Sequence, residues 1–250
     1  MNPKIRLEDH GHWAWLIVDR PEAKNAIDRE TMVQLKETIL KLKLREDLVL
    51  LGIRGAGDIF IAGGDIKDLA LIKDASSAEQ MSSEMNGVLI ALGELDCLSV
   101  AVINGDAYGG GCELALACDV RILQSGSRLF FKQAAMGLTP GWGGGQRLAR
   151  LLGPGKATMY YATGAVVEFA EALSSGLVDF VDENVTERIE AWAKRMEKYS
   201  PMAIRYTKRA IREGQTKSTA EAFEAETRLF GECWASEPHH QAVAAFLKRR

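Results

Sequence analysis

Three consecutive glycines, Gly109, Gly110 and Gly111, stand between an apolar segment at 99–103 and a helical segment that carries one acid, Glu113. Glycine permits close approach of the backbone and unusual φ values. The amides at the start of a helix have no partner inside the helix and point toward negative charge. The segment is typical of a site that holds an oxyanion beside a carboxylate, although a glycine-rich connection followed by a surface glutamate has the same pattern.

A second glycine-bearing turn follows the apolar segment at 49–54 and contains Gly64. Two such turns can direct their amides at one oxygen. An oxyanion hole needs at least two donors about 3 Å from the charged oxygen, and losing one donor typically costs roughly 3 kcal/mol of transition-state stabilisation. We therefore expect the amides of Gly64 and Gly110 to hold a developing oxyanion, with Glu113 as the neighbouring acid.

Four ordered motifs extend this pattern over most of the chain, and further matches follow at 201–208 and 245–249. The motifs are RPEAKNA at 20–26, FIAGGDI at 60–66, ING at 103–105 followed by GGGCE at 109–113, and GLTPGWGGGQRL at 137–148. Together they resemble the enoyl-CoA hydratase/isomerase, or crotonase, superfamily. This resemblance implies an α/β fold, a crotonase-like spiral of ββα units with a C-terminal helical region, and an acyl-CoA thioester as substrate.

The resemblance also implies roles for individual residues. Gly64 and Gly110 match the positions whose amides hold the thioester oxygen. Lys24 and Lys67 are equally typical of solvated lysines, and Trp142 and Phe246 of packing residues. Contacts to substrate or CoA are implied for Ala23, Lys24, Ala62, Asp65, Ile66, Lys67, Gln133 and Trp142, and, from a neighbouring subunit, for Phe246 and Arg249.

The reaction depends on a departure from the family pattern. Hydratases of the family use two glutamates, and Gln133 stands at the position of the second one, seven residues before Pro140. An amide can orient a water molecule but cannot accept its proton. Gly141, where dienoyl-CoA isomerases of the family have aspartate, offers no replacement acid. Since a general acid–base group contributes about 10²- to 10⁴-fold, Gln133 predicts a poor hydratase.

Chemistry with a single carboxylate is still open. Loss of CO2 from a malonyl-type thioester forms the enolate without a base, and double-bond isomerisation can use Glu113 alone as a proton shuttle. Short motifs around Met136, Pro140 and Trp142 and at 228–234 are similar to ethylmalonyl-CoA decarboxylase-like members and favour decarboxylation. The alternatives are an enoyl-CoA hydratase that works despite Gln133, and an acyl-CoA-binding or scaffolding protein without activity.

Composition limits the other classes. The 250 residues are 47% hydrophobic and 26% charged, which suits one large α/β domain, and the net charge of −3 gives no nucleic-acid footprint. No apolar run has the length of a membrane span and the N-terminus lacks a signal core, so a cytoplasmic protein is expected. The cysteines at 97, 112, 118 and 233 are predicted to be free thiols, mostly buried.

Other chemistries lack their spacing. The glycines at 141–145 give neither a dinucleotide-binding nor a P-loop motif, and no nucleophile elbow of an acyl-serine hydrolase occurs. The four histidines lie near the two ends of the chain without zinc-site spacing. We expect no metal, and no cofactor besides the coenzyme A of the substrate.

Hydrophobic periodicity predicts strands at 12–18, 49–54 and 99–103, and a helix from the N-cap Asp28 to about Leu44. From about 144 onward the pattern is helical, with a new helix at Ser200 and three helical blocks in the last 50 residues. We divide the chain into a spiral core at 1–195 and a helical trimerisation region at 196–250. The resemblance implies a homotrimer or a hexamer, and apolar positions predicted to pack between subunits are Phe223, Leu229, Phe230, Trp234 and Phe246.

Overall fold

The computed structural model describes residues 3–248, which wind into two sheets. In the larger sheet the strand order is β1-β2-β3-β4-β6-β9. The first two strands are antiparallel and all other neighbours are parallel. The strands are β1 (Ile5–Asp9), β2 (Trp13–Val18), β3 (Leu50–Gly55), β4 (Leu98–Ile103), β6 (Val120–Gln124) and β9 (Phe180–Asp182).

The smaller sheet has the order β5-β7-β8 and consists of β5 (Ala107–Tyr108), β7 (Arg128–Phe130) and β8 (Val166–Glu168). Isolated bridges from Ile27 to Gly64 and from Ile59 to Asp106 continue it toward the N-terminal half. Each turn of the chain adds one strand to each sheet, β4 then β5 and β6 then β7. This winding confirms the expected spiral of ββα units.

Helices connect and cover the sheets, and their starts follow local capping chemistry. The Asp28 side chain accepts a hydrogen bond from the Thr31 amide, as predicted for this cap. The helix predicted to start at Ser200 begins at Pro201, and the Ser200 side chain caps it by accepting from the Ala203 amide. The helices are α1 (Arg29–Lys43), α2 (Ile66–Leu69), α3 (Ala75–Gly93), α4 (Gly110–Ala115), α5 (Gly144–Leu152), α6 (Pro154–Thr163), α7 (Phe169–Ser175), α8 (Val185–Met196), α9 (Pro201–Gly214), α10 (Thr219–Trp234) and α11 (Glu237–Leu247).

The expectation of helix from 144 onward is wrong at two places, because β8 and β9 interrupt it. Each has three residues and lies at the edge of a sheet, where pairing with β7 or β6 fixes the extended backbone. Segments this short carry no readable periodicity. The three helical blocks of the last 50 residues are confirmed as α9, α10 and α11.

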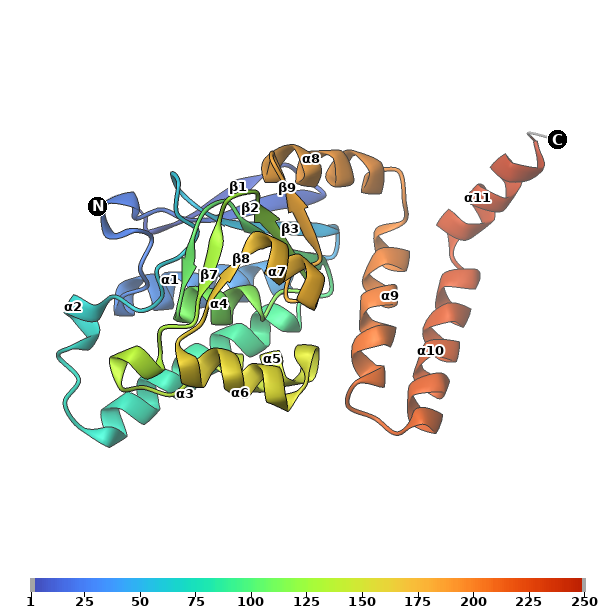
Figure 1. The fold of residues 1–250 in the computed structure, drawn as a ribbon. Helices are drawn as coiled ribbons and strands as arrows, with labels where there is room; N and C mark the ends of the chain where they lie inside the picture. Colours follow the sequence, from blue (N-terminus) through green and yellow to red (C-terminus); the bar gives the residue numbers. More distant parts are fainter. Residues whose placement is uncertain (1–2, 249–250) are drawn as a thin grey trace.

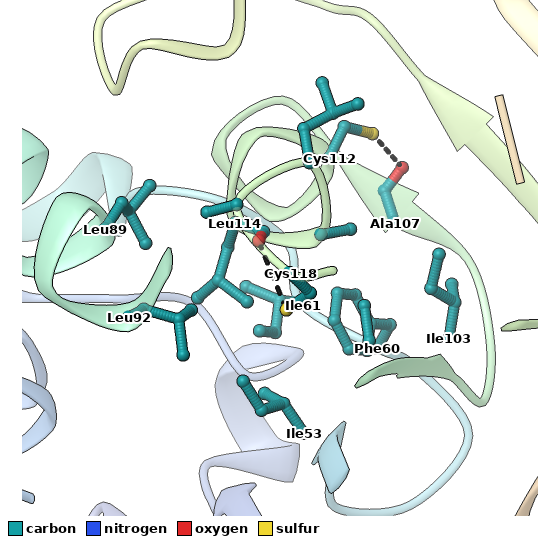
Figure 2. Packing of buried hydrophobic residues seen from close by; sticks show 14 of the residues in the cluster. Ile53, Phe60, Ile61, Leu89, Leu92, Ile103, Ala107, Cys112, Leu114 and Cys118 are labelled. Carbon is teal, nitrogen blue, oxygen red and sulfur yellow. Dashed lines mark hydrogen bonds between the residues drawn. The ribbon is translucent and has the colours of Figure 1, made fainter. Parts of the chain in front are cut away.

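Helix α4, which carries Glu113, is held in place by its buried side chains. Figure 2 shows Cys112 and Leu114 among buried side chains from several elements, including Phe60 and Ile103. The Cys112 thiol donates to the Ala107 carbonyl at 3.3 Å, and burial raises its pKa to about 12. Cys112 is therefore an inert packing residue that fixes α4, as predicted for a buried thiol.

The last three helices form an arm beside the sheets (Figure 1). Lys208 of α9 pairs with Asp119 at 2.6 Å, and Arg209 pairs with Asp96, so α9 is held against the body. Helix α10 packs on α9, and α11 lies at the far end of the arm. Within residues 3–248, no helix is both long and apolar enough to cross a membrane.

Candidate active site

The two glycine-bearing turns lie directly against each other. The Tyr108 amide donates to the Ile61 carbonyl at 3.0 Å, which aligns the chain entering the second turn with the chain entering the first. A Cβ added to Gly63 would lie 3.0 Å from the Gly110 nitrogen, so only glycine lets the two backbones approach this closely. The fold thus brings together two turns that are more than forty residues apart in sequence.

The backbone amides of Gly64 and Gly110 are free donors within the described part of the chain. Neither donates a hydrogen bond to any acceptor within residues 3–248. Gly110 is the first residue of α4, where the helix itself offers no acceptor. Both residues are partly accessible to solvent. The pair therefore has the donor chemistry that an oxyanion requires.

Glu113 is 2% exposed, so the reading of it as a surface glutamate is wrong. One carboxylate oxygen, Oε2, accepts from the amides of Trp142 and Gly144, each at 2.8 Å. The other, Oε1, accepts from the Gln133 side chain at 3.0 Å and from the Gly141 amide at 3.4 Å. Each oxygen therefore accepts two hydrogen bonds, and all four partners are donors.

Gln133 is also buried, at 7% exposure, and its side-chain nitrogen faces Glu113. Its oxygen Oε1 is buried and has no hydrogen-bond partner among residues 3–248, and the same holds for the hydroxyl of Tyr161. Burial, assisted by the charge of Glu113, raises the pKa of Tyr161, which keeps that hydroxyl protonated. Burial lowers the pKa of Arg147, while the charge of Glu113 opposes this shift.

The Trp142 indole lies against both glycines and is 6% exposed. A Cβ added to Gly110 would lie within 2.7 Å of three indole carbons, and one added to Gly64 would lie 3.5 Å from Cζ2 of the same ring. Trp142 also belongs to the main hydrophobic core. Trp142 therefore packs in the core and also lies beside the two glycine-bearing turns.

The residues expected to contact CoA lie on two adjacent segments. The Ala62 amide donates to the Lys24 carbonyl at 3.1 Å, and Lys24 has a left-handed backbone with φ 53°. Asp65 accepts from Arg20 at 2.9 Å and caps α2, so its carboxylate is engaged within the chain. Ala23 and Ala62 are half-buried, and the exposed residues of this set are Lys24, Ile66 and Lys67.

The tail residues lie elsewhere. Phe246 is exposed on α11, at the end of the arm away from α2 and α4 (Figure 1). Arg249 lies outside the described residues. The single chain therefore assembles Gly64, Gly110, Glu113, Gln133 and Trp142 in one place but leaves Phe246 apart.

Sequence reasoning missed several positioning residues. Asn25 is fully buried, and its side-chain nitrogen donates to the carbonyls of Ala56, Ile59 and Phe60, which fixes the chain before Gly64. The position of Asn25 inside the RPEAKNA motif could have indicated that it has a role at the site.

Two further missed residues act at the other side of the site. Arg147 donates to the Trp142 carbonyl at 2.8 Å. A Cβ on Gly144 would collide with Tyr161 and lie 2.8 Å from Oε2 of Glu113, so glycine is required there. Nothing in the sequence pattern relates Tyr161 or Arg147 to Glu113, because these contacts arise only from folding.

Comparison with known proteins identifies the family of this chain. The family model described as enoyl-CoA hydratase/isomerase matches residues 14–250. The chain belongs to the enoyl-CoA hydratase/isomerase family. The members of this family are enzymes that act on acyl-CoA. The match agrees with the resemblance seen in the sequence.

Individual members of the enoyl-CoA hydratase/isomerase family carry different activities in their names. The chain is 34% identical over 249 residues to a crotonyl-CoA hydratase of Syntrophomonas wolfei, covering 98% of this chain and 95% of the relative. It is 31% identical over 241 residues to an ethylmalonyl-CoA decarboxylase of Xenopus laevis, covering 95% and 81%. The crystal structure of an enoyl-CoA hydratase from Bacillus anthracis superposes with a TM-score of 0.92 at 27% identity, covering 99% and 97%.

Proposed function

We propose that this chain decarboxylates a malonyl-type CoA thioester, with the amides of Gly64 and Gly110 holding the thioester oxygen. The bond between the α-carbon and the carboxylate breaks, its electron pair moves into the thioester to form the enolate, and CO2 leaves. A proton then adds to the α-carbon, either directly from solvent or from Glu113 after Glu113 has itself been protonated. The first step needs donors at the oxygen but no base, and no cofactor besides the coenzyme A of the substrate.

The hydrogen bonding of Glu113 carries this proposal. A carboxylate has about four lone-pair sites, and four donors already face those of Glu113. To take a proton from water or from a substrate carbon, Glu113 must first lose one of these donors. Hydration and isomerisation both begin with such a transfer, whereas decarboxylation does not. The arrangement therefore supports the reaction whose first step needs no base.

Two other reactions have support of their own. The name of the 34% identical relative favours hydration, but Gln133 cannot act as a second base. Isomerisation needs a single carboxylate, which Glu113 could provide after a donor is displaced. The non-enzymatic alternative is a binding or scaffolding protein without turnover. The amides of Gly64 and Gly110, which are free donors within the described residues, favour an enzyme over that alternative.

The remaining site assignments and the assembly are part of the proposal. We assign Ala23, Lys24, Ala62, Asp65, Ile66 and Lys67 to the CoA side, and Gln133 and Trp142 to the acyl side. Apolar side chains of the arm are exposed, as expected of an interface between subunits: Phe223, Phe230, Trp234 and Phe246. Leu229, however, is buried within its own chain, so its expected place between subunits is wrong. A homotrimer or hexamer in the cytoplasm completes the proposal.

A product screen by mass spectrometry tests the reaction class. The wild-type enzyme is incubated with malonyl-, methylmalonyl-, ethylmalonyl- and crotonyl-CoA, and each product is identified by mass. We expect the decarboxylated thioester from at least one malonyl-type substrate, formed faster than the hydrated crotonyl product. Hydration alone contradicts the decarboxylase proposal, and tight binding of every thioester without turnover supports the binding protein instead.

A further inference from the structure

The acyl side of the site is occupied by a protein side chain. The Trp142 indole packs on Gly110 so closely that a Cβ there would collide with it, and it also lies beside Gly64. An acyl group whose thioester oxygen binds to those two amides must therefore extend along the indole. Gly64, Gly110 and the Trp142 indole therefore lie close together at this end of the site.

Mostly apolar residues lie beside the indole. A small cavity next to the ring is lined by Ile27 and Met32, by Leu69 of α2 and by Met81 of α3, and also by Asp28 and Arg29. Leu69 also closes the space over Gly64, since a Cβ there would lie 2.5 Å from its Cδ1. A cavity this small among closely packed side chains favours a short acyl chain over a long one.

The backbone at Trp142 is fixed from both sides, which keeps the indole in place. The Trp142 amide donates to Glu113 and its carbonyl accepts from Arg147, both at 2.8 Å. The preceding carbonyl, of Gly141, accepts from Ser82 at 2.5 Å and from Asn86 at 3.1 Å. Moving the indole with its backbone would break these bonds, including one that holds the catalytic carboxylate.

We infer that Trp142 determines acyl-chain specificity: its indole confines the substrate to acyl chains of about four carbons or fewer, counted from the thioester carbonyl, and excludes octanoyl. This inference rests on the proposed binding of an acyl-CoA thioester at Gly64 and Gly110. A methylene that does not fit a hydrophobic pocket typically changes discrimination by about 10-fold or more. The Trp142→Ala substitution should therefore relax the limit on chain length strongly.

Calorimetric binding of saturated thioesters tests the inference without requiring turnover. Acetyl-, butyryl-, hexanoyl- and octanoyl-CoA, and free CoA, are titrated into wild type, Trp142→Ala, Trp142→Phe and Trp192→Ala. Trp192 lies on α8 and packs on Phe180. Its substitution by alanine is the matched control, because it also removes one indole. Trp142→Phe keeps an aromatic ring and provides an intermediate volume if the alanine variant folds poorly.

We expect wild type and Trp192→Ala to bind butyryl-CoA at least about 10-fold more tightly than octanoyl-CoA. Trp142→Ala should remove that preference, Trp142→Phe should reduce it, and affinity for free CoA should not change. Equal affinities for butyryl- and octanoyl-CoA in wild type, or an unchanged ratio in both Trp142 variants, overturns the inference while acyl-CoA binding stands. Absence of binding by every thioester overturns the inference together with the proposed function.

Discussion

The side-chain nitrogen of Gln133 donates to Oε1 of Glu113 at 3.0 Å, and both residues are buried. The residue that the resemblance places at the family's second glutamate is therefore a hydrogen-bond donor to Glu113. The side-chain amide of Gln133 helps to hold the Glu113 carboxylate in place, together with the backbone amides of Trp142 and Gly144.

Restoring the second carboxylate should change the reaction. Gln133→Glu replaces a donor to Glu113 by a second acid that can accept a proton from water, so crotonyl-CoA hydration should rise by at least about 10-fold. Gln133→Ala removes the same donor without adding an acid, so any gain in hydration should be well below that of Gln133→Glu. Steady-state kcat/KM for hydration is the measurement. A similar rise in both variants would show that the added carboxylate is not responsible.

The same substitution predicts a pH-dependent loss of stability. Two facing carboxylates raise the pKa of one of them in the folded state. A raised pKa gives stability that is present at low pH and lost as pH rises through the folded value. The Tm deficit of Gln133→Glu against wild type should therefore be larger at pH 8 than at pH 5, whereas that of Gln133→Ala should be similar at both. A deficit independent of pH in Gln133→Glu would contradict the facing arrangement.

Glu113→Gln should lower both stability and turnover. The new amide group turns a donor toward at least one of the donors at Gln133, Trp142 or Gly144, and each buried donor left without an acceptor costs about 1–3 kcal/mol. Chemical denaturation measures the loss. Glu94→Gln is the control, because Glu94 is half-exposed and pairs with Lys43 at the surface, where about 0–1 kcal/mol is expected. Equal, small losses in both variants would show that the buried contacts of Glu113 contribute little.

A double-mutant cycle tests the contact between Gly110 and Trp142. Gly110→Ala should cost about 1–3 kcal/mol in wild type, because its Cβ collides with the indole. The cost should largely disappear in a Trp142→Ala background. Additive effects in the cycle would mean that the indole does not lie on Gly110 in solution.

The Trp142→Ala background also gives a clean test of the oxyanion donor. Gly110→Pro and Gly110→Ala both add a Cβ there, but only proline removes the N–H, and proline is accepted at the first position of a helix. The proline variant should turn over a short substrate at least about 10²-fold more slowly than the alanine variant. Its affinity for free CoA should be unchanged, and equal turnover in the two would remove Gly110 from the oxyanion hole.

The capping residue Asp28 should contribute stability at neutral pH that is lost in acid. Burial opposes its ionisation, but hydrogen bonds from Lys4 and Thr31 and the charge of Arg20 bring its pKa down to about 2. A lowered pKa gives stability above about pH 4 that is lost as pH falls toward 2. Asp28→Asn should therefore be about 1–2 kcal/mol less stable than wild type at pH 6, after allowance for solvent screening, with the gap closing toward pH 2. A gap that does not narrow on acidification would contradict this account.

Much of the fold followed from local sequence signals. The caps at Asp28 and Ser200, the strands that became β2, β3 and β4, and the two glycine turns depend on residues close together in the chain. The short strands β8 and β9 were missed because their extended form comes from pairing at a sheet edge.

The candidate site was predictable in its residues but not in its contacts. Glu113, Gly64, Gly110, Gln133 and Trp142 could be selected by type and motif. That Gln133 donates to Glu113, and that Trp142 lies on Gly110, depends on distances across 20 and 32 residues of chain, which only the folded packing determines. The engagement of Asp65 with Arg20 is a similar case.

The most direct test of the central proposal is the ratio of two kcat/KM values in the wild-type enzyme: CO2 release from ethylmalonyl-CoA and hydration of crotonyl-CoA. The saturated hydrogen bonding of Glu113 and the amide at Gln133 predict that CO2 release is faster by at least about 10²-fold, the contribution typical of a missing acid–base group. Hydration at the rate of a two-glutamate hydratase, with no CO2 released, would contradict the account.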